Sequence, residues 1–576
     1  MATVDPSTYV ELHAHSCWSL REGASRSDEL VDRALELGYP ALALTDHDNL
    51  YGAMEFAQAA RERGLRPITG AEVTLAGEPQ TAGSGPAAGS EVPRLNGSGP
   101  RSARHRDQAG ADRRGGRHRD RAAGSPSHLT LLAADTEGYR NLCRLLSRAH
   151  RVHGKDTPRV EQASLFEHHE GLIVLSGCRE GELSRLLDPL GEPDHRAARV
   201  LVGSYRDVFG DRYYIELQHH AVHGDSGRVG ALNALAARLG VSTVATNNAH
   251  YHVRERHRLN DVLVAVRHRL TLDASHRERR PNSEFFLKSG AEMARRFARY
   301  PAAIAASGEI AGRCAFDLCT DIPYRLPDRS VPEGHTLDSY LRQICERAFE
   351  RRYGTDPPPI RREARERLDR ELGLIARHGL AGFFLVYWDI LQLVSEVAHE
   401  LHGRPWNLAP DEKPVGRGRG SSVSSIVCYL IGLSHLDPVR NKLYLERFLN
   451  DELISLPDID LDFPRDIRDE LLRRVYDRWG PEHAALVAAF PTYQMRSAVL
   501  DIGKALGLPG PALAKLNKLG GHFVGAENVE QEMSRIPELR SLSGAPVWRD
   551  LVDLARQVAG FPRHISQHVG GIVISA

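Results

Sequence analysis

Short apolar runs alternate with helix-like amphipathic stretches through the first half of the chain, from about residue 8 to residue 285. Runs such as residues 41–44 (ALAL) and 173–175 (IVL) have the length and aliphatic content of buried strands. Strands that alternate with helices are typical of an α/β architecture built on parallel strands. We therefore expect an α/β fold for this half of the chain.

One segment interrupts this alternation. Residues from about 77 to 127 are rich in Gly, Ser, Ala, Pro and Arg and have almost no apolar periodicity. We expect a disordered surface insertion here. Its basic run, residues 101–121, leaves open a second role as an arm along a nucleic-acid backbone.

The second half of the chain is predicted to be mainly helical. Helical patterns cover residues 335–400 and 495–560, and the proline run 357–359 marks a connector because proline cannot continue a helix. Residues 401–414 are expected to form a polar loop. A length of 576 residues exceeds what one hydrophobic core supports, which predicts three or more domains.

The composition is that of an ordinary globular protein, with 41% apolar and 26% charged residues. Lys and Arg together balance Asp and Glu, 75 against 75, so any contact with nucleic acid must come from local basic patches. The seven cysteines are scattered, which favours a reducing cytoplasm. We find no signal peptide and no apolar run long enough to span a bilayer, and therefore expect no membrane contact.

The first candidate site begins at residues 9–15. Strand alternation places Glu11, His13 and His15 on one face, where two imidazoles can converge on one metal ion. Further polar residues follow other apolar runs, and the carboxyl ends of strands are where α/β barrels gather their active sites. These residues are Asp46, His47, Glu72, Cys178 and His250. Because the chain has 28 histidines, the alternative for any single one is an isolated or hydrogen-bonded residue.

This set of residues resembles the metal ligands of the polymerase and histidinol phosphatase (PHP) family. The resemblance implies a distorted β/α barrel with a cluster of two or three ions, and the donor mix suits Zn²⁺ or Mn²⁺. The ligands that it implies are His13 and His15 (H-x-H), His47 (T-D-H), Glu72 (G-A-E), His128, Cys178 (S-G-C) and His250 (D-x-H).

Two positions depart from the family pattern. The aspartate usual after H-x-H is Glu22 here, and the aspartate of D-x-H is Asn248. A neutral amide still coordinates a cation but lacks the charge that helps to hold a second ion and to lower the pKa of bound water. We therefore favour metal binding over phosphodiester hydrolysis by a proofreading exonuclease.

The second candidate site is the acidic segment 456–463 (LPDIDLDF). At strand period Asp458, Asp460 and Asp462 share one face, and carboxylates on one surface are what two-metal nucleotidyl transfer with Mg²⁺ requires. An exposed acidic strand or a calcium loop would give the same pattern.

A glycine-rich segment, residues 416–422 (GRGRGSS), lies upstream and leads into a run with helical spacing at residues 423–431. Glycines allow the backbone to approach a phosphate closely, and a helix N-terminus offers unpaired N–H groups. Most glycine-rich loops are simple turns, so this segment alone is weak evidence for a phosphate site. The acidic strand that follows within about 40 residues strengthens that interpretation.

Taken together, residues 418–421 (GRGS), 446–450 and 457–463 resemble the palm of C-family bacterial replicative polymerases, the DNA polymerase III alpha subunits. The resemblance makes Asp458 and Asp460 two of three catalytic metal ligands. It also places four residues around the triphosphate of the incoming nucleotide: Arg419, Gly420, Ser421 and Arg447. Residues 382–386, 563–564 and 568–574 resemble further family segments.

Residues 313–318 and 337–342 resemble the error-prone, damage-associated type of alpha subunit. That type implies template-directed synthesis across lesions. Its implied partners are primer-template DNA, deoxynucleoside triphosphates, and a sliding clamp and mutagenesis accessory proteins bound through a C-terminal region. The third catalytic aspartate of the family is expected beyond residue 576, so the chain alone is expected to be inactive as a polymerase.

The expected organisation is a multidomain α/β protein. A PHP barrel (1–285, with the insertion 77–127) precedes the first part of a polymerase-beta-like palm (286–490), a helical thumb (491–562) and the start of the second part of the palm (563–576). Two alternatives are a PHP-type phosphoesterase with a nucleic-acid-binding second half and a non-catalytic DNA-binding scaffold.

Overall fold

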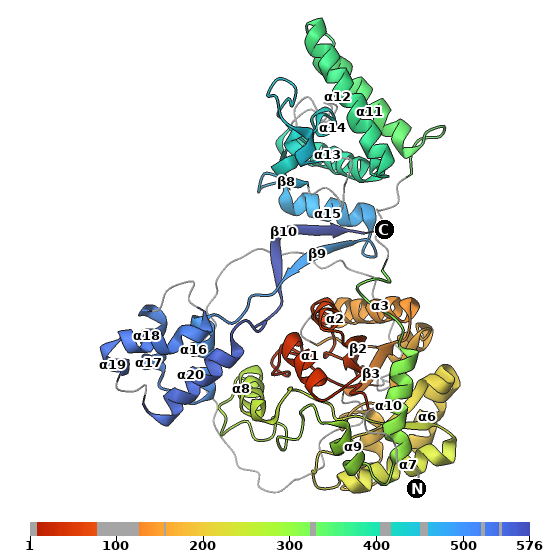
Figure 1. The fold of residues 1–576 in the computed structure, drawn as a ribbon, viewed down its shortest axis with the longest axis vertical. Coiled ribbons are helices and arrows are strands. Elements are labelled where there is room, and N and C mark those ends of the chain that lie inside the picture. Colours follow the sequence, from red (N-terminus) through yellow and green to blue (C-terminus); the bar gives the residue numbers. More distant parts are fainter. Residues whose placement is uncertain are drawn as a thin grey trace, which may run out of the picture. The chain divides into compact units, whose positions relative to one another are not determined.

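The computed structural model describes residues 9–77, 126–154, 157–322, 330–403, 416–449, 459–519, 525–540 and 544–575. The chain divides into two compact units. The first contains residues 1–322 and 491–564, and the second contains residues 323–490 and 565–576 (Figure 1). The predicted insertion 77–127 and the predicted polar loop 401–414 fall mostly outside the described residues.

The first unit is built on a six-stranded sheet with the strand order β1-β2-β3-β4-β5-β6. The strands are β1 (Ala41–Leu44), β2 (Arg66–Leu75), β3 (Ser127–Ala133), β4 (Leu172–Leu175), β5 (Tyr213–Leu217) and β6 (Ser242–Ala245). β3 runs antiparallel to both of its neighbours, while the other neighbouring pairs are parallel. The prediction of a sheet built on parallel strands is therefore wrong for β3.

Residues 9–15 connect the two edges of this sheet. Glu11 forms a parallel bridge with Leu42 of β1, and Ala14 forms one with Ala249, four residues after β6. The H-x-H segment is thus held by backbone hydrogen bonds on both sides. This arrangement agrees with a PHP-type half barrel, and it brings the ends of β1, β2 and β6 together around the histidines.

Helices cover the sheet and bury its aliphatic side chains (Figure 1). The helices before residue 322 are α1 (Ser27–Glu36), α2 (Ala53–Glu62), α3 (Thr136–His153), α4 (Gln162–Glu167), α5 (Glu182–Leu186), α6 (His195–Phe209), α7 (Asp225–Leu239), α8 (His257–His268), α9 (Gly290–Arg296) and α10 (Pro301–Arg313), of which α8 packs elsewhere. α3 illustrates the local cause: Asp135 caps its N-terminus by accepting from the N–H of Gly138, and its apolar face is buried.

A helical segment late in the sequence belongs to the same unit. It contains α16 (Met495–Ala505), α17 (Gly510–Leu519), α18 (Val529–Arg535), α19 (Pro537–Arg540) and α20 (Pro546–Val558). Its apolar side chains share one core with α8, including Val262, Val499 and Leu551. The mainly helical character predicted for residues 495–560 is confirmed.

The second unit is largely helical. Its helices are α11 (Leu337–Tyr353), α12 (Pro358–Arg377), α13 (Ala381–His402), α14 (Ile426–Leu430) and α15 (Arg468–Trp479). The predicted break at the proline run is present, but Pro358 lies in the first turn of α12, where a missing N–H costs nothing.

The second unit also contains two small antiparallel sheets. One pairs β7 (Arg417–Arg419) with β8 (Asp460–Asp462), and the other pairs β9 (Ala484–Ala489) with β10 (Ser566–Ile574). The helix expected over residues 423–431 is shorter than predicted, because a 3₁₀ turn (Gly420–Ser424) precedes α14.

Helix α13 corrects the expectation that no apolar run is long enough to span a bilayer. It has 22 residues, and among the described residues it is the one helix that is long and apolar enough. About 61% of its most apolar 18-residue window is buried inside the protein, as expected for a core helix. Phe384 and Leu385 pack in the core with α11 and α12, and Val394 packs against α15.

Candidate metal centre and nucleotide site

Backbone pairing positions the first site. The N–H of His15 donates to the carbonyl of Ala249 at 2.7 Å, and the N–H of Ala249 donates to the carbonyl of His13 at 2.8 Å. His47 forms a bridge with Glu72 of β2. Residues that are far apart in the sequence are therefore held together by the sheet itself.

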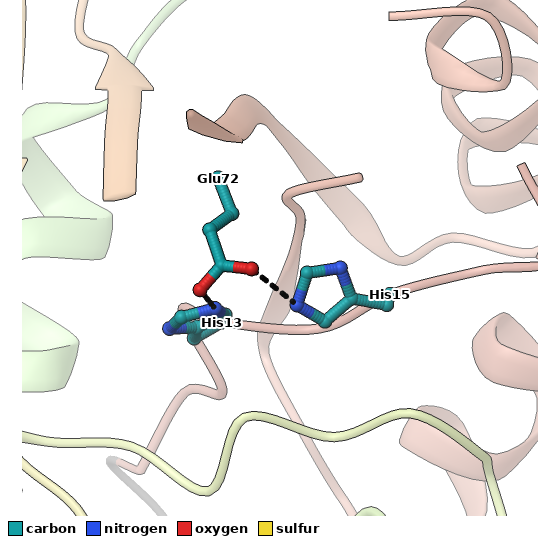
Figure 2. Close-up of side chains that lie close together, drawn as sticks. All are labelled: His13, His15 and Glu72. Carbon is teal, nitrogen blue, oxygen red and sulfur yellow. Dashed lines mark ion pairs between the residues drawn. The ribbon is translucent and has the colours of Figure 1, made fainter. Parts of the chain in front are cut away.

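The carboxylate of Glu72 is the hub of the site. Its Oε1 lies 3.3 Å from Nε2 of His13 and 3.4 Å from Nδ1 of His128. Its Oε2 lies 3.0 Å from Nδ1 of His47 and 3.7 Å from Nε2 of His15. Figure 2 shows His13 and His15 directed at the two oxygens. Two ligand groups, His13–His15–Glu72 and His47–Glu72–His128, thus share one carboxylate and could each hold a metal ion.

Several buried polar atoms at this site have no hydrogen-bond partner. Among the described residues they include Nε2 of His13, His15 and His250, Oδ1 of Asn248 and Oε1 of Glu72. Native proteins rarely leave buried polar groups unpaired, and imidazole nitrogen with carboxylate oxygen is a donor set for Zn²⁺ or Mn²⁺. The residues therefore fit a metal centre.

The pKa shifts follow from burial and mutual charge. Burial alone would raise the pKa of Glu72, but His128 and the other imidazoles hold it well below its usual value. Burial lowers the pKa of His15 well below its usual value. The pKa of His13 is raised to about 10 despite burial, because the carboxylates of Glu216 and Glu72 flank its ring.

Glu216 is a functional residue that the sequence analysis missed. Its Oε1 lies 2.7 Å from Nδ1 of His13, and both side chains are fully buried. The same oxygen accepts from Gln218 at 2.7 Å and from the hydroxyl of Thr246. A carboxylate on the second nitrogen of a metal-binding histidine fixes its tautomer and ring orientation. Its sequence signal was an acidic residue inside an otherwise apolar strand, β5.

Two further predicted ligands, Cys178 and His250, lie beside His128 and His15. Sγ of Cys178 is 3.5 Å from Nδ1 of His128, and burial raises the thiol pKa well above normal. The ring of His250 stacks on His15 with centroids 4.2 Å apart. Asn248 is buried with a positive φ of 45°, a conformation that asparagine tolerates better than most residues. No described contact joins its side chain to the other predicted ligands.

Glu22 is shared between two partners. Its carboxylate lies 3.4 Å from Nδ1 of His47 and also pairs with the guanidinium of Arg267. Glu22, which stands where the family has an aspartate, is therefore shared between His47 and Arg267.

The second site is the small sheet of the second unit. In the β7–β8 ladder Arg419 lies directly opposite Asp460, and Arg417 lies opposite Asp462. Nε of Arg419 contacts Oδ2 of Asp462 at 2.8 Å. Asp460 is exposed to solvent. Asp458 and the side chain of Arg447 lie outside the described residues.

The glycines of this site satisfy steric demands of the backbone. Gly420 has a φ of 72°, in the left-handed region that favours glycine. A Cβ on Gly418 would lie 2.6 Å from the carbonyl oxygen of Leu433. Ser421 is partly buried and its carbonyl accepts from the hydroxyl of Ser424 at 2.6 Å. The turn is thus fixed by its glycine conformations and by this hydrogen bond.

Glu371 of α12 anchors the far end of this turn. Its buried carboxylate accepts from the hydroxyl of Ser425 at 2.8 Å and from the N–H groups of Ile426 and Val427 at 2.9 and 3.2 Å. Burial raises its pKa, and these hydrogen bonds oppose the rise. The glycine-rich segment is therefore attached to the helical core rather than free in solution.

Comparison with known proteins gives two family matches. Residues 11–220 match the PHP domain, and residues 339–576 match the bacterial DNA polymerase III alpha NTPase domain. Error-prone DNA polymerases are among its relatives. That of Mycobacterium bovis is 37% identical over 568 residues, covering 98% of this chain and 46% of the relative. That of Nocardia farcinica is 38% identical over 584 residues, covering 98% and 47%. That of Symbiobacterium thermophilum is 35% identical over 589 residues, covering 99% and 47%. The chain spans about half the length of these curated relatives.

Proposed function

The chain belongs to the error-prone type of the bacterial DNA polymerase III alpha family and carries an N-terminal PHP domain, and on this premise we propose that it forms part of a template-directed DNA polymerase. The reaction is nucleotidyl transfer with two Mg²⁺ ions in synthesis across damaged templates. The substrates are primer-template DNA and deoxynucleoside triphosphates.

The observation that carries this proposal is the register of the β7–β8 ladder. It sets Arg419 opposite Asp460, although about 40 residues separate them in the sequence. Side chains directly opposite each other on one sheet are within contact distance. A cation for phosphate and a carboxylate for metal therefore lie side by side, as transfer from a triphosphate requires.

In this proposal Asp458 and Asp460 hold the Mg²⁺ ions, which neutralise triphosphate charge and activate the primer hydroxyl. Arg419 and Arg447 bind the triphosphate through charge-assisted hydrogen bonds, together with the Ser421 hydroxyl and the backbone at Gly420. Arg419 contacts Asp462 in the present structure, so the triphosphate competes with Asp462 for this guanidinium.

The domain roles remain those that the sequence predicts. We assign the palm to residues 286–490 and 563–576 and the thumb to residues 491–562, although residues 286–322 and 491–564 share the first compact unit with the PHP sheet. A sliding clamp and mutagenesis accessory proteins are proposed partners through a C-terminal region.

Primer extension tests the catalytic assignment. The assay uses a polymerase of the relatives' full length that contains this chain, with Mg²⁺ and a primed template. We expect extension to disappear in Asp458→Asn and in Asp460→Asn but to persist in Asp469→Asn, which changes an exposed carboxylate on α15. Extension by both active-site variants at the unmodified rate would refute the assignment.

A second candidate function is metal-dependent phosphoester hydrolysis by the PHP domain. It is favoured by the buried Nε2 atoms of His13 and His15, which have no hydrogen-bond partner. Hydrolysis of single-stranded DNA by this chain with Mn²⁺, lost in His13→Ala, would support it. Metal-dependent hydrolysis that is unchanged in His13→Ala would exclude this site as its source.

A further inference from the structure

Two arginines reach the metal centre from one stretch of chain. Arg267 lies in the last turn of α8, and Arg280 lies in the segment that follows it. The guanidinium of Arg267 pairs with the Glu22 carboxylate. Nη2 of Arg280 lies 2.9 Å from Nδ1 of His250. Each arginine thus contacts a residue that the family pattern assigns to metal.

Phe285 holds Arg280 in place. The guanidinium of Arg280 lies over the Phe285 ring, with 4.9 Å to the ring centroid. Burial lowers the pKa of Arg280, while Glu72 and Cys178 act to raise it, so this cation lies within the field of the metal ligands. Its Nε has no hydrogen-bond partner.

The hydrogen bond from Arg280 determines which nitrogen of His250 carries the proton. A guanidinium can only donate, so Nδ1 of His250 must accept from it and cannot itself carry a proton. The proton of the neutral ring is then on Nε2, which leaves that nitrogen no lone pair for a metal. Nδ1 also lies 3.2 Å from the carbonyl oxygen of Glu22, a contact that requires the opposite tautomer. The two contacts cannot be satisfied together, and the one from Arg280 is the shorter.

The charge of Arg280 leads to the same conclusion. Its guanidinium lies 2.9 Å from Nδ1 of His250 and is buried in the field of Glu72. The other replaced position, Asn248, is neutral. A divalent ion bound to the same imidazole would therefore lie close to a buried cation, and two like charges at that distance repel each other.

We propose that Arg280 and a divalent metal ion exclude one another on His250, so that this chain holds one ion fewer than a PHP centre in which His250 is a ligand. The Arg267–Glu22 ion pair also disfavours metal binding, because Arg267 occupies the carboxylate that lies beside His47. The remaining ligand groups, both of which include Glu72, stay open to metal.

Counting bound Mn²⁺ tests this inference with the 576-residue chain. The metal is measured by mass spectrometry after equilibrium dialysis, and its affinity by calorimetry. We expect Arg280→Met to bind one more Mn²⁺ per chain than the unmodified protein, and the double variant Arg280→Met with His250→Gln to lose that additional ion. Arg279→Met is the matched control, because Arg279 pairs with Asp261 and contacts no predicted ligand.

His250→Gln alone gives an independent result if Arg280→Met does not fold. We expect it to bind as many ions as the unmodified protein, since Arg280 already excludes metal from His250. Loss of one ion in this variant, or an unchanged count in folded Arg280→Met, would overturn the competition. Absence of Mn²⁺ from every variant would overturn both the proposed metal centre and this inference, while the primer-extension result would be unaffected.

Discussion

The metal centre of the first unit and the acidic strand of the second unit differ in solvent exposure, and therefore in how their charges are stabilised. At the metal centre Glu72 is only 2% exposed and four imidazoles surround it. At the acidic strand Asp460 is exposed, and Asp462 and Arg419 are each about half exposed. Buried polar groups must find partners within the protein, whereas exposed charges are solvated and screened by water.

This difference in burial determines how much of each site's function can be inferred from its side-chain contacts. At the buried centre two features indicate metal binding. Several described polar atoms have no hydrogen-bond partner, and the Glu216 carboxylate contacts Nδ1 of His13. The exposed strand shows a register and an ion pair between Arg419 and Asp462. Substitutions should therefore have large effects on metal binding in the first region and smaller, graded effects on nucleotide binding in the second.

Removal of the shared carboxylate should have the largest effect. In Glu72→Gln both ligand groups lose their anionic member, so we expect the affinity for Mn²⁺ to fall by more than about 100-fold, beyond the loss typical of an outer-shell partner. Calorimetric titration measures this. Glu137→Gln, an exposed carboxylate on α3, is the control. Equal affinity in the two variants would show that Glu72 is not the hub.

Glu216→Gln should have the next largest effect. The amide cannot accept from His13 as a charged carboxylate does, so the imidazole loses its fixed tautomer, and we expect a loss of about 10- to 100-fold in Mn²⁺ affinity. Glu216→Asp should restore part of this loss because the charge is kept. If Glu216→Gln binds Mn²⁺ normally, the role of Glu216 is structural only.

In the second region, Arg419→Ala should weaken binding of a deoxynucleoside triphosphate with Mg²⁺ by roughly 10-fold, the range for one charge-assisted hydrogen bond. Fluorescence titration with a labelled nucleotide measures it. Arg473→Ala on α15 is the control, since Arg473 pairs with Glu470 and Asp477. A change of the same size in both variants would mean that binding follows general charge.

Asp462→Asn should have the smallest effect, with the opposite sign. It frees Arg419 from a surface ion pair, and such pairs contribute about 0–1 kcal/mol, so nucleotide binding should tighten by no more than a few fold. The same titration measures it. Weaker binding in Asp462→Asn would instead indicate that Asp462 contributes to metal binding.

Local patterns in the sequence were sufficient for part of this account. Period-two alternation is a property of a single strand, so the convergence of His13 and His15 could be predicted without knowledge of the fold. The motifs around Asp460 and Gly420 identified the family, and the matched relatives confirm that membership. Strands β1 and β4 were predicted from their apolar runs.

The pairing direction of β3 and the burial of α13 could not be predicted in this way. β3 is antiparallel to both neighbours because its pairing depends on the connections and not on its own composition. α13 is apolar enough to resemble a membrane span, yet its apolar residues are covered by α11, α12 and α15. Burial by other elements cannot be read from a segment alone.

By itself, the sequence determined which chemical groups this protein carries and which family they indicate. Only the tertiary structure decided that Glu72 serves both ligand groups, that Glu216 stands behind His13, and that Arg280 donates to His250. These contacts join residues from 25 to 203 positions apart. Their energies depend on distance and burial, which are properties of the folded chain, whereas residue identity and strand period are fixed by the sequence.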